Sequence, residues 1–391
     1  MTTSDTQENQ PVDYLEPFET FQAYALRGGM IYRGRIRSKF AEDRARLKDV
    51  LGAAPGDHHL EEIDGRLFAT LRTYRGRRPP RRLWLHVTLL VLTIITTIAA
   101  GAEMTRGQTS GLVLLPYEFG IDAMTDILLG EWGNLVRARL PAFLSEMARG
   151  IPYATALLFV LISHEMGHYL AARRHGVNAT LPFLLPAPFF FGTFGAIIKM
   201  RSPVMHRRAL FDVGVAGPLS GLVASLIVCA VGLGLSHQVP MPRATWQGIE
   251  LGWSPALAIM TRLVMGPVAA GHMVSFHPVA IAGWFGLFVT FLNLMPLGQL
   301  DGGHLWYALV GRRQRYVSMV GLGLLAGMGV QFPAWLVLAA LALLVFRFRH
   351  PPVMDESVRL GRGRVVLGIV VVLVFLLLFV PRPISLVEYR G

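Results

Sequence analysis

Apolar residues along this chain are gathered into runs of about twenty, the length that a helix needs to cross about 30 Å of hydrocarbon. Polar and charged residues, arginine above all, lie between these runs rather than within them. The pattern predicts a polytopic α-helical membrane protein. Five runs are interpreted as single crossings, at about residues 83–102, 151–172, 210–235, 278–297 and 365–380.

The pattern of a further apolar stretch, residues 316–346, does not decide how many times this stretch crosses the membrane. It could be one long tilted helix or two short helices broken at Phe332-Pro333. Arginines tend to stay on the cytoplasmic side of a membrane, and a single crossing would place the arginines of 347–364 outside. This bias favours two short crossings. The total is then seven crossings, or six if the stretch is unbroken.

Residues 180–200 are apolar but cannot form a regular helix. Pro182, Pro186 and Pro188 lie within seven residues, and a proline inside a helix removes a hydrogen bond and clashes with the preceding turn. Non-helical backbone survives at membrane depth only where protein or a water-filled cavity covers it. We expect a re-entrant loop or hairpin that enters from the cytoplasmic side.

In the first 82 residues the apolar positions follow the patterns of short strands and a short helix, as in a soluble fold, and not runs of about twenty. They predict a small N-terminal α+β head, soluble and cytoplasmic, with a hairpin turn at Asp64-Gly65. The expected elements are a strand-like run at 30–37, a helix at 40–51, and strands at 59–63 and 66–74. A membrane-embedded domain over 83–381 and a short tail at 382–391 complete the expected organisation.

The composition of the chain indicates which kinds of partner to expect. Hydrophobic residues make up 53% of the chain and charged residues 16%, against about 25% charged in an ordinary soluble domain. The net charge of +12 could indicate nucleic acid, but the arginines cluster beside the apolar runs, as they do when they orient membrane helices. We therefore expect a lipid bilayer and no nucleic acid. The single cysteine, Cys229, excludes disulfides and cysteine-rich zinc sites.

The first 19 residues are polar and acidic, without the plan of a signal peptide or of an arginine-rich transit peptide. Together with the arginine clusters, this predicts a bacterial cytoplasmic (inner) membrane, with the N-terminus in the cytoplasm and the C-terminus outside.

The sequence His164-Glu165-Met166-Gly167-His168 lies within the second apolar run. Residues four apart share one face of a helix, so both imidazoles can reach one Zn²⁺ with the glutamate beside the open coordination position. The alternative is two helical histidines that flank a glutamate by chance. It has to explain three ionisable residues in one turn of a membrane helix, where a charge costs about 2.5–3.5 kcal/mol.

Two histidines leave a catalytic zinc short of a third protein ligand. Asp301 is a lone carboxylate after the fourth apolar run, and Gly302-Gly303 beside it allow close backbone approach. His304 is the rival ligand, and Asp301 is favoured over it because a carboxylate suits an inward-turned position. The remaining histidines, His175 and His206 among them, show no comparable spacing.

These motifs resemble the site-2 protease family of intramembrane zinc metalloproteases. His164–His168 pairs with Asn293…Pro296…Asp301-Gly302, and similar neighbourhoods occur at Gly192–Ala196 and at Phe211-Asp212…Ala216-Gly217-Pro218. The resemblance covers about residues 83–381 and is greatest to the branch without a PDZ domain, which includes the plant ethylene-dependent gravitropism-deficient and yellow-green proteases. It implies one zinc per chain, metal ligands His164, His168 and Asp301, a general base at Glu165 and a supporting polar group at Asn293.

The expected reaction is hydrolysis of peptide bonds within transmembrane segments of other membrane proteins, as in regulated intramembrane proteolysis. Two other classes stay open. A metal-ion transporter would also hold histidine and aspartate at membrane depth, but it would not need a glutamate between two ligands. A catalytically inactive scaffold would not need an intact Glu165. The amide of Asn293 is equally consistent with helix packing, and the oligomeric state is open.

Overall fold

The computed structural model describes residues 14–26, 29–54, 56–74, 83–105, 140–188, 190–241, 246–346 and 350–389. The chain divides into two compact units, Met1–Arg82 and Leu83–Gly391. The arginine run at 75–82 and most of the loop at 103–149 lie outside the described residues.

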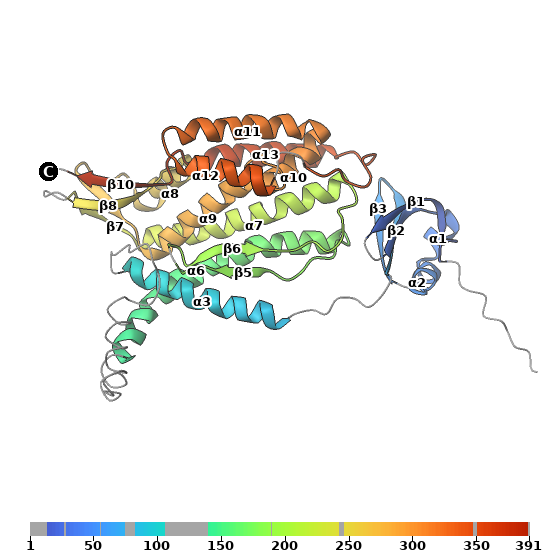
Figure 1. The fold of residues 1–391 in the computed structure, drawn as a ribbon, viewed down its shortest axis with the longest axis horizontal. Coiled ribbons are helices and arrows are strands. Elements are labelled where there is room, and N and C mark those ends of the chain that lie inside the picture. Colours follow the sequence, from blue (N-terminus) through green and yellow to red (C-terminus); the bar gives the residue numbers. More distant parts are fainter. Residues whose placement is uncertain are drawn as a thin grey trace, which may run out of the picture. The chain divides into compact units, whose positions relative to one another are not determined.

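The N-terminal unit is a four-stranded antiparallel sheet with two short helices. Its strand order is β1-β2-β4-β3, and the helices pack on it through a cluster that includes Phe40, Leu47 and Leu71 (Figure 1). The elements are β1 Phe18–Leu26, β2 Gly29–Ile36, α1 Ser38–Glu42, α2 Arg44–Gly52, β3 Gly56–Ile63 and β4 Arg66–Tyr74.

Local sequence accounts for most of this head. Asp64 and Gly65 both have positive φ, 51° and 74°, as the tight turn between β3 and β4 requires. The helix expected at 40–51 is divided at Asp43, whose side chain accepts a hydrogen bond of 3.0 Å from the backbone N–H of Arg46 and caps α2. The first strand, β1, was not expected from its pattern.

The second unit is mostly helical. Its helices are α3 Leu83–Thr105, α6 Leu140–Arg174, α7 Arg207–Gly234, α8 Pro255–Met265, α9 Pro278–Leu294, α10 Asp301–Val310, α11 Gln314–Gly329, α12 Ala334–Leu341 and α13 Arg362–Leu377. Among the described residues, three helices are long and apolar enough to cross a membrane: Leu83–Thr105, Phe143–Arg174 and Arg207–Gly234. Shorter apolar helices occur at Pro255–Met265, Pro278–Leu294 and Ala334–Leu344. A helical membrane protein is consistent with this finding, whereas six to seven crossings remain a prediction.

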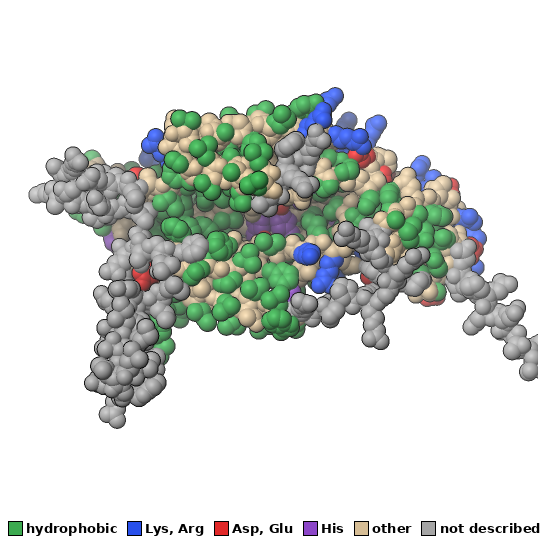
Figure 2. All heavy atoms as spheres, viewed as in Figure 1, with side chains coloured by type: hydrophobic (Ala, Val, Ile, Leu, Met, Phe, Trp, Pro, Cys, Tyr) green, Lys and Arg blue, Asp and Glu red, His purple; other side chains and the backbone are tan. Residues whose placement is uncertain are grey.

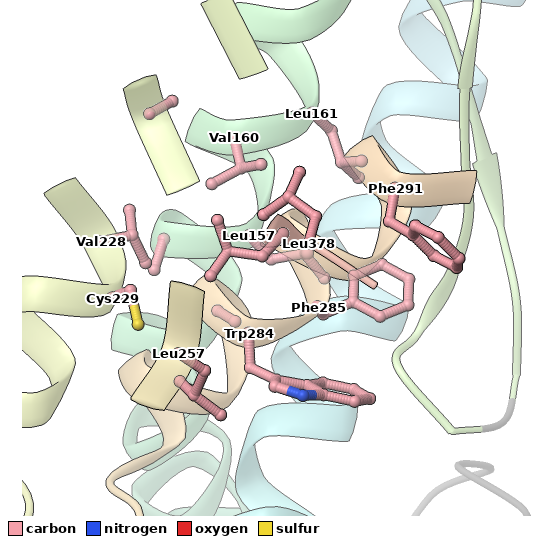
Figure 3. Packing of buried hydrophobic residues seen from close by; sticks show 14 of the residues in the cluster. Leu157, Val160, Leu161, Val228, Cys229, Leu257, Trp284, Phe285, Phe291 and Leu378 are labelled. Atoms are coloured by element: carbon pink, nitrogen blue, oxygen red, sulfur yellow. The ribbon is translucent and has the colours of Figure 1, made fainter. Parts of the chain in front are cut away.

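Helices α6, α7 and α9 lie side by side and enclose the main core of this unit (Figure 1). Side chains from all three helices meet there, and Cys229 is buried among them as a free thiol (Figure 3). Those labelled in Figure 3 include Leu157, Val160, Val228, Trp284, Phe285 and Phe291. Large apolar side chains also cover much of the outer surface (Figure 2), as expected for a protein solvated by lipid.

The proline-rich segment forms a hairpin of β5 Phe183–Pro186 and β6 Thr193–Ile197, and the pairing extends to a bridge between Ala179 and Met200. The hairpin packs against α3 and α6 (Figure 1). Thr96 of α3 donates a hydrogen bond of 2.7 Å to the carbonyl of Gly192. Strand pairing and such contacts satisfy the non-helical backbone, so the predicted loop or hairpin is a hairpin.

The stretch at 316–346 is broken where the sequence predicts. Helix α11 ends at Gly329 and α12 starts at Ala334, with Phe332 and Pro333 between them. Residues 382–391, expected only as a short tail, contribute strand β10 Ile384–Tyr389. This strand pairs with β8 Trp246–Leu251, far away in the sequence.

Candidate metal centre

Helix α6 holds His164 and His168 on one face, one turn apart, and both side chains are buried. The helix is apolar around them because it packs against α7 and α9. Histidine side chains are visible deep between the hydrophobic surfaces of the molecule (Figure 2). The predicted helical spacing therefore places two imidazoles in the interior of the unit.

Asp301, the first residue of α10, meets these two histidines across 133 residues of sequence. His164 Nε2 and His168 Nε2 lie 3.2 Å apart. Asp301 Oδ2 lies 3.4 Å from the former nitrogen and 3.2 Å from the latter. Tetrahedral zinc with bonds of about 2.0–2.1 Å has ligand atoms about 3.3–3.4 Å apart, so this group fits one zinc ion.

The proton positions on His168 support the same conclusion. Its Nδ1 lies 2.7 Å from the backbone carbonyl oxygen of Val213, which can only accept, so Nδ1 carries the proton and donates. The lone pair of Nε2 then faces the other imidazole and the carboxylate. A second hydrogen bond of this kind orients metal-bound histidines in many proteins.

Two glycines of α7 make room for the imidazoles. A Cβ atom at Gly217 would lie 2.0 Å from His168 Nε2, and one at Gly221 would lie 2.7 Å from His164 Nδ1. Their four-residue spacing is typical of close helix packing, and the sequence offered no further role for them. In the structure they are the positions at which a larger residue would displace the histidines.

The chain turn between α9 and α10 explains why Asp301 faces inward. A Cβ at Gly302 would lie 2.1 Å from the carbonyl oxygen of Leu294, and one at Gly303 would lie 2.1 Å from that of Gly298. Only glycine permits this approach. His304, the rival ligand, lies farther along α10, and its Nδ1 is 2.8 Å from His350 Nε2. Among the described residues, Asp301 and not His304 joins the group of three.

Glu165 and Asn293 border this group. Glu165 is 8% exposed, and its carboxylate is hydrogen-bonded to the backbone of Ile198, directly after strand β6. The amide nitrogen of Asn293, on α9, lies 3.1 Å from His164 Nε2. Asn293 therefore lies at a metal-facing atom of His164, and β6 ends beside Glu165.

A second polar cluster was missed by sequence reasoning. Asp212 on α7 accepts two hydrogen bonds of 2.7 Å from Arg364 on α13. His175, just after α6, lies 2.8 Å from the same carboxylate. The motif around Asp212 was noted, but nothing in the sequence connects it to an arginine 152 residues away.

A mostly helical membrane chain with two histidines, one carboxylate and a neighbouring glutamate in its interior has the features of a zinc metalloprotease. Residues 152–332 match the family model described as "Peptidase family M50". The chain thus carries a peptidase family M50 domain, and the predicted resemblance to site-2 proteases is confirmed.

Curated relatives agree with this assignment. "Probable zinc metalloprotease EGY1, chloroplastic" of Arabidopsis thaliana is 30% identical over 90% of this chain and 66% of its own length. The protein of the same name from Oryza sativa subsp. japonica is 29% identical over 93% of this chain and 64% of its own length. "Probable zinc metalloprotease EGY2, chloroplastic" of Arabidopsis thaliana is 31% identical over 95% of this chain and 62% of its own length. No solved structure matches the chain.

These names support the predicted zinc cofactor and metalloprotease class. The chain spans just under two thirds of the length of these relatives. The predicted bacterial inner membrane is wrong. The relatives are chloroplastic plant proteins, which points to a chloroplast membrane. The prediction rested on the composition of the first residues, which does not identify a compartment in a chain matching only part of its relatives.

Proposed function

We propose that this protein is an intramembrane zinc endopeptidase that hydrolyses peptide bonds within transmembrane segments of other membrane proteins, in a chloroplast membrane. One observation carries the proposal: three ligand atoms converge within 4.8 Å of one another, and two of them, with Glu165, belong to a helix long and apolar enough to span a bilayer. Such a constellation is costly at membrane depth unless it is used.

In this proposal His164, His168 and Asp301 hold the zinc ion, one per chain. A bound zinc ion supplies Lewis-acid chemistry, because it polarises a scissile carbonyl and makes water acidic enough to deprotonate near neutral pH. Glu165, the residue next to His164, takes a proton from that water and returns it to the nitrogen of the leaving amine. Asn293 directs its amide toward the substrate backbone or the developing oxyanion.

Substrate presentation is assigned to the hairpin. A helical segment hides its peptide bonds in its own hydrogen bonds, so it must unwind before hydrolysis. Strand β6 belongs to a two-stranded sheet among the described residues and leads directly to Ile198, the residue hydrogen-bonded to Glu165. Phe194 and Ile197 are largely exposed on it, at 65% and 55%. An extended substrate added beside β6 would run toward the proposed base.

The test uses purified protein in detergent with a panel of single-span substrates, and fragments are identified by mass spectrometry. We expect cuts inside the apolar segments. Glu165→Gln should reduce the rate by about 10²–10⁴ while zinc content and thermal stability stay at wild-type levels. Glu250→Gln, at an exposed glutamate on β8, is the matched control and should retain full activity.

The same assay separates the other classes of function. A transporter would move metal ions across vesicles regardless of Glu165→Gln, and a scaffold would bind substrates without producing fragments. Cleavage by Glu165→Gln at the wild-type rate would overturn the proposed mechanism. Cleavage confined to extramembrane loops would overturn the proposed site of action.

A further inference from the structure

A cavity of about 210 Å³ lies apart from the metal-binding group, where α10, the start of α11 and the segment before α13 meet. None of the three proposed ligands lines it. Its lining residues are Tyr307, Arg312, Gln314, Arg315, His350 and Pro352.

The charge of this cavity comes from two arginines. Arg312 is 81% exposed, and its Nε lies 3.4 Å from Glu356, the one carboxylate paired with a lining arginine among the described residues. The Glu356 carboxylate also accepts a hydrogen bond of 3.0 Å from the hydroxyl of Tyr307. The guanidinium of Arg315 stacks over the ring of Tyr316 at 4.6 Å. The charge of two guanidinium groups is therefore offset by one paired carboxylate among the described residues.

His350 adds no charge to this balance. Burial, together with the neighbouring His304, lowers the pKa of His350 to about 4, so its ring is neutral near pH 7. Its Nδ1 faces the carbonyl of Pro351 and its Nε2 faces His304. The net charge at the cavity is positive because of the arginines alone, and it favours an anion with oxygens that a guanidinium can bind.

The position of the cavity narrows the class of anion. Helix α11 begins at Gln314, and a stripe of exposed apolar or aromatic side chains runs along it from its first turn. Tyr316, Met319, Val320 and Leu324 are each more than half exposed and have the spacing of one helix face. Figure 2 shows the broad hydrophobic surface to which such helices contribute. An amphiphile with an anionic head would match both the arginines and the stripe.

We propose that this cavity binds the anionic headgroup of a membrane lipid, a phosphate or sulfonate held by Arg312 and Arg315, with an acyl chain along α11. The cavity is connected to the proposed metal centre only through α10, which carries both Tyr307 and Asp301, and through the contact of His350 with His304 on the same helix. Bound lipid would hold the segment before α13 against α10 and stabilise both. The inference does not depend on the proposed reaction.

The test is native mass spectrometry of the purified protein incubated with equal amounts of phosphatidylglycerol and phosphatidylcholine. Wild type should retain phosphatidylglycerol preferentially. Replacing both arginines, Arg312→Gln with Arg315→Gln, should lower that retention on the order of tenfold, since two charge-assisted contacts are lost. The matched control, Arg313→Gln with Arg362→Gln, removes the same charge at two exposed arginines that do not line the cavity and should change retention less than twofold.

Three outcomes would overturn the proposal. Equal losses in the two double variants would show general attraction between arginines and anionic lipid. If inorganic phosphate alone raised the melting temperature of the protein as much as phosphatidylglycerol does, the cavity would be a site for a soluble anion. An acidic peptide that displaced the lipid and depended on the same arginines would identify a protein partner. If the glutamine variant does not fold, Arg312→Lys with Arg315→Lys keeps the charge but not the guanidinium geometry, and it should still weaken retention several-fold.

Discussion

Helix α6 and the residues just after it take part in two histidine–carboxylate clusters, and the clusters differ in where their cation comes from. In one, His175 and Asp212 meet Arg364, whose guanidinium binds the carboxylate through two hydrogen bonds. In the other, His164 and His168 meet Asp301, and the ring nitrogens converge on the carboxylate without an arginine or lysine among the described partners. The first cluster is complete within the chain.

The comparison shows how a metal-binding group differs from a structural ion pair. A buried carboxylate is costly unless a cation or hydrogen-bond donors face it. Arg364 is the cation that faces Asp212, and the contact joins α13 to α7. His175 joins the end of α6 to the same carboxylate. Three ligand atoms at the edge lengths of a tetrahedron instead match a cation supplied from outside. The first arrangement predicts a role in stability, and the second a role in metal binding.

The largest effect that would test this difference is loss of a proposed ligand. Asp301→Ala should lower zinc affinity more than about 100-fold, beyond the range seen when only a supporting partner is lost. His168→Ala should do the same. His304→Ala is the control on α10 and should keep about one zinc per chain, measured by elemental analysis. Full zinc content in Asp301→Ala together with loss in His304→Ala would make His304 the third ligand.

A smaller effect should follow from filling the space beside the imidazoles. Gly217→Ala would place a methyl group 2.0 Å from His168 Nε2, so the ring must move away from its partners. We expect zinc affinity to fall about 10–100-fold, as for loss of an orienting contact. Gly234→Ala, on the same helix with no atom within 4 Å of the added group, should bind zinc normally. Equal affinities in the two variants would contradict the assigned role of Gly217.

The smallest expected effect is the loss of stability when the ion pair between Arg364 and Asp212 is broken. Arg364→Gln leaves Asp212 with a weaker set of partners. The side chains of Arg364 and Asp212 are 34% and 26% exposed, so solvent screening limits the loss to about 1–2 kcal/mol of unfolding free energy. Thermal unfolding in detergent measures it, with Arg362→Gln on the same helix as control. Zinc content should be unchanged, and its loss in Arg364→Gln would show that the two clusters act as one.

The sequence by itself determined the features that arise from short-range periodicity. Apolar runs specified helices, and the i, i+4 spacing placed His164 and His168 on one face of α6. Three prolines in 180–200 excluded a helix, and Asp64-Gly65 specified a turn. The break at Phe332-Pro333 follows from the same local rules. These results need no knowledge of distant residues, because the cause and the effect lie within a few positions of each other.

Only the tertiary structure decided which distant groups meet. Asp301 rather than His304 lies with the histidines because Gly302 and Gly303 bring α10 against the end of α9, while His304 faces His350. The contact of Arg364 with Asp212 spans 152 residues, and no local pattern specifies such a pair. The four-residue spacing of Gly217 and Gly221 indicates close helix packing but cannot show that an imidazole lies opposite. Side-chain type and local period follow from the sequence, whereas proximity between helices depends on how the whole chain packs.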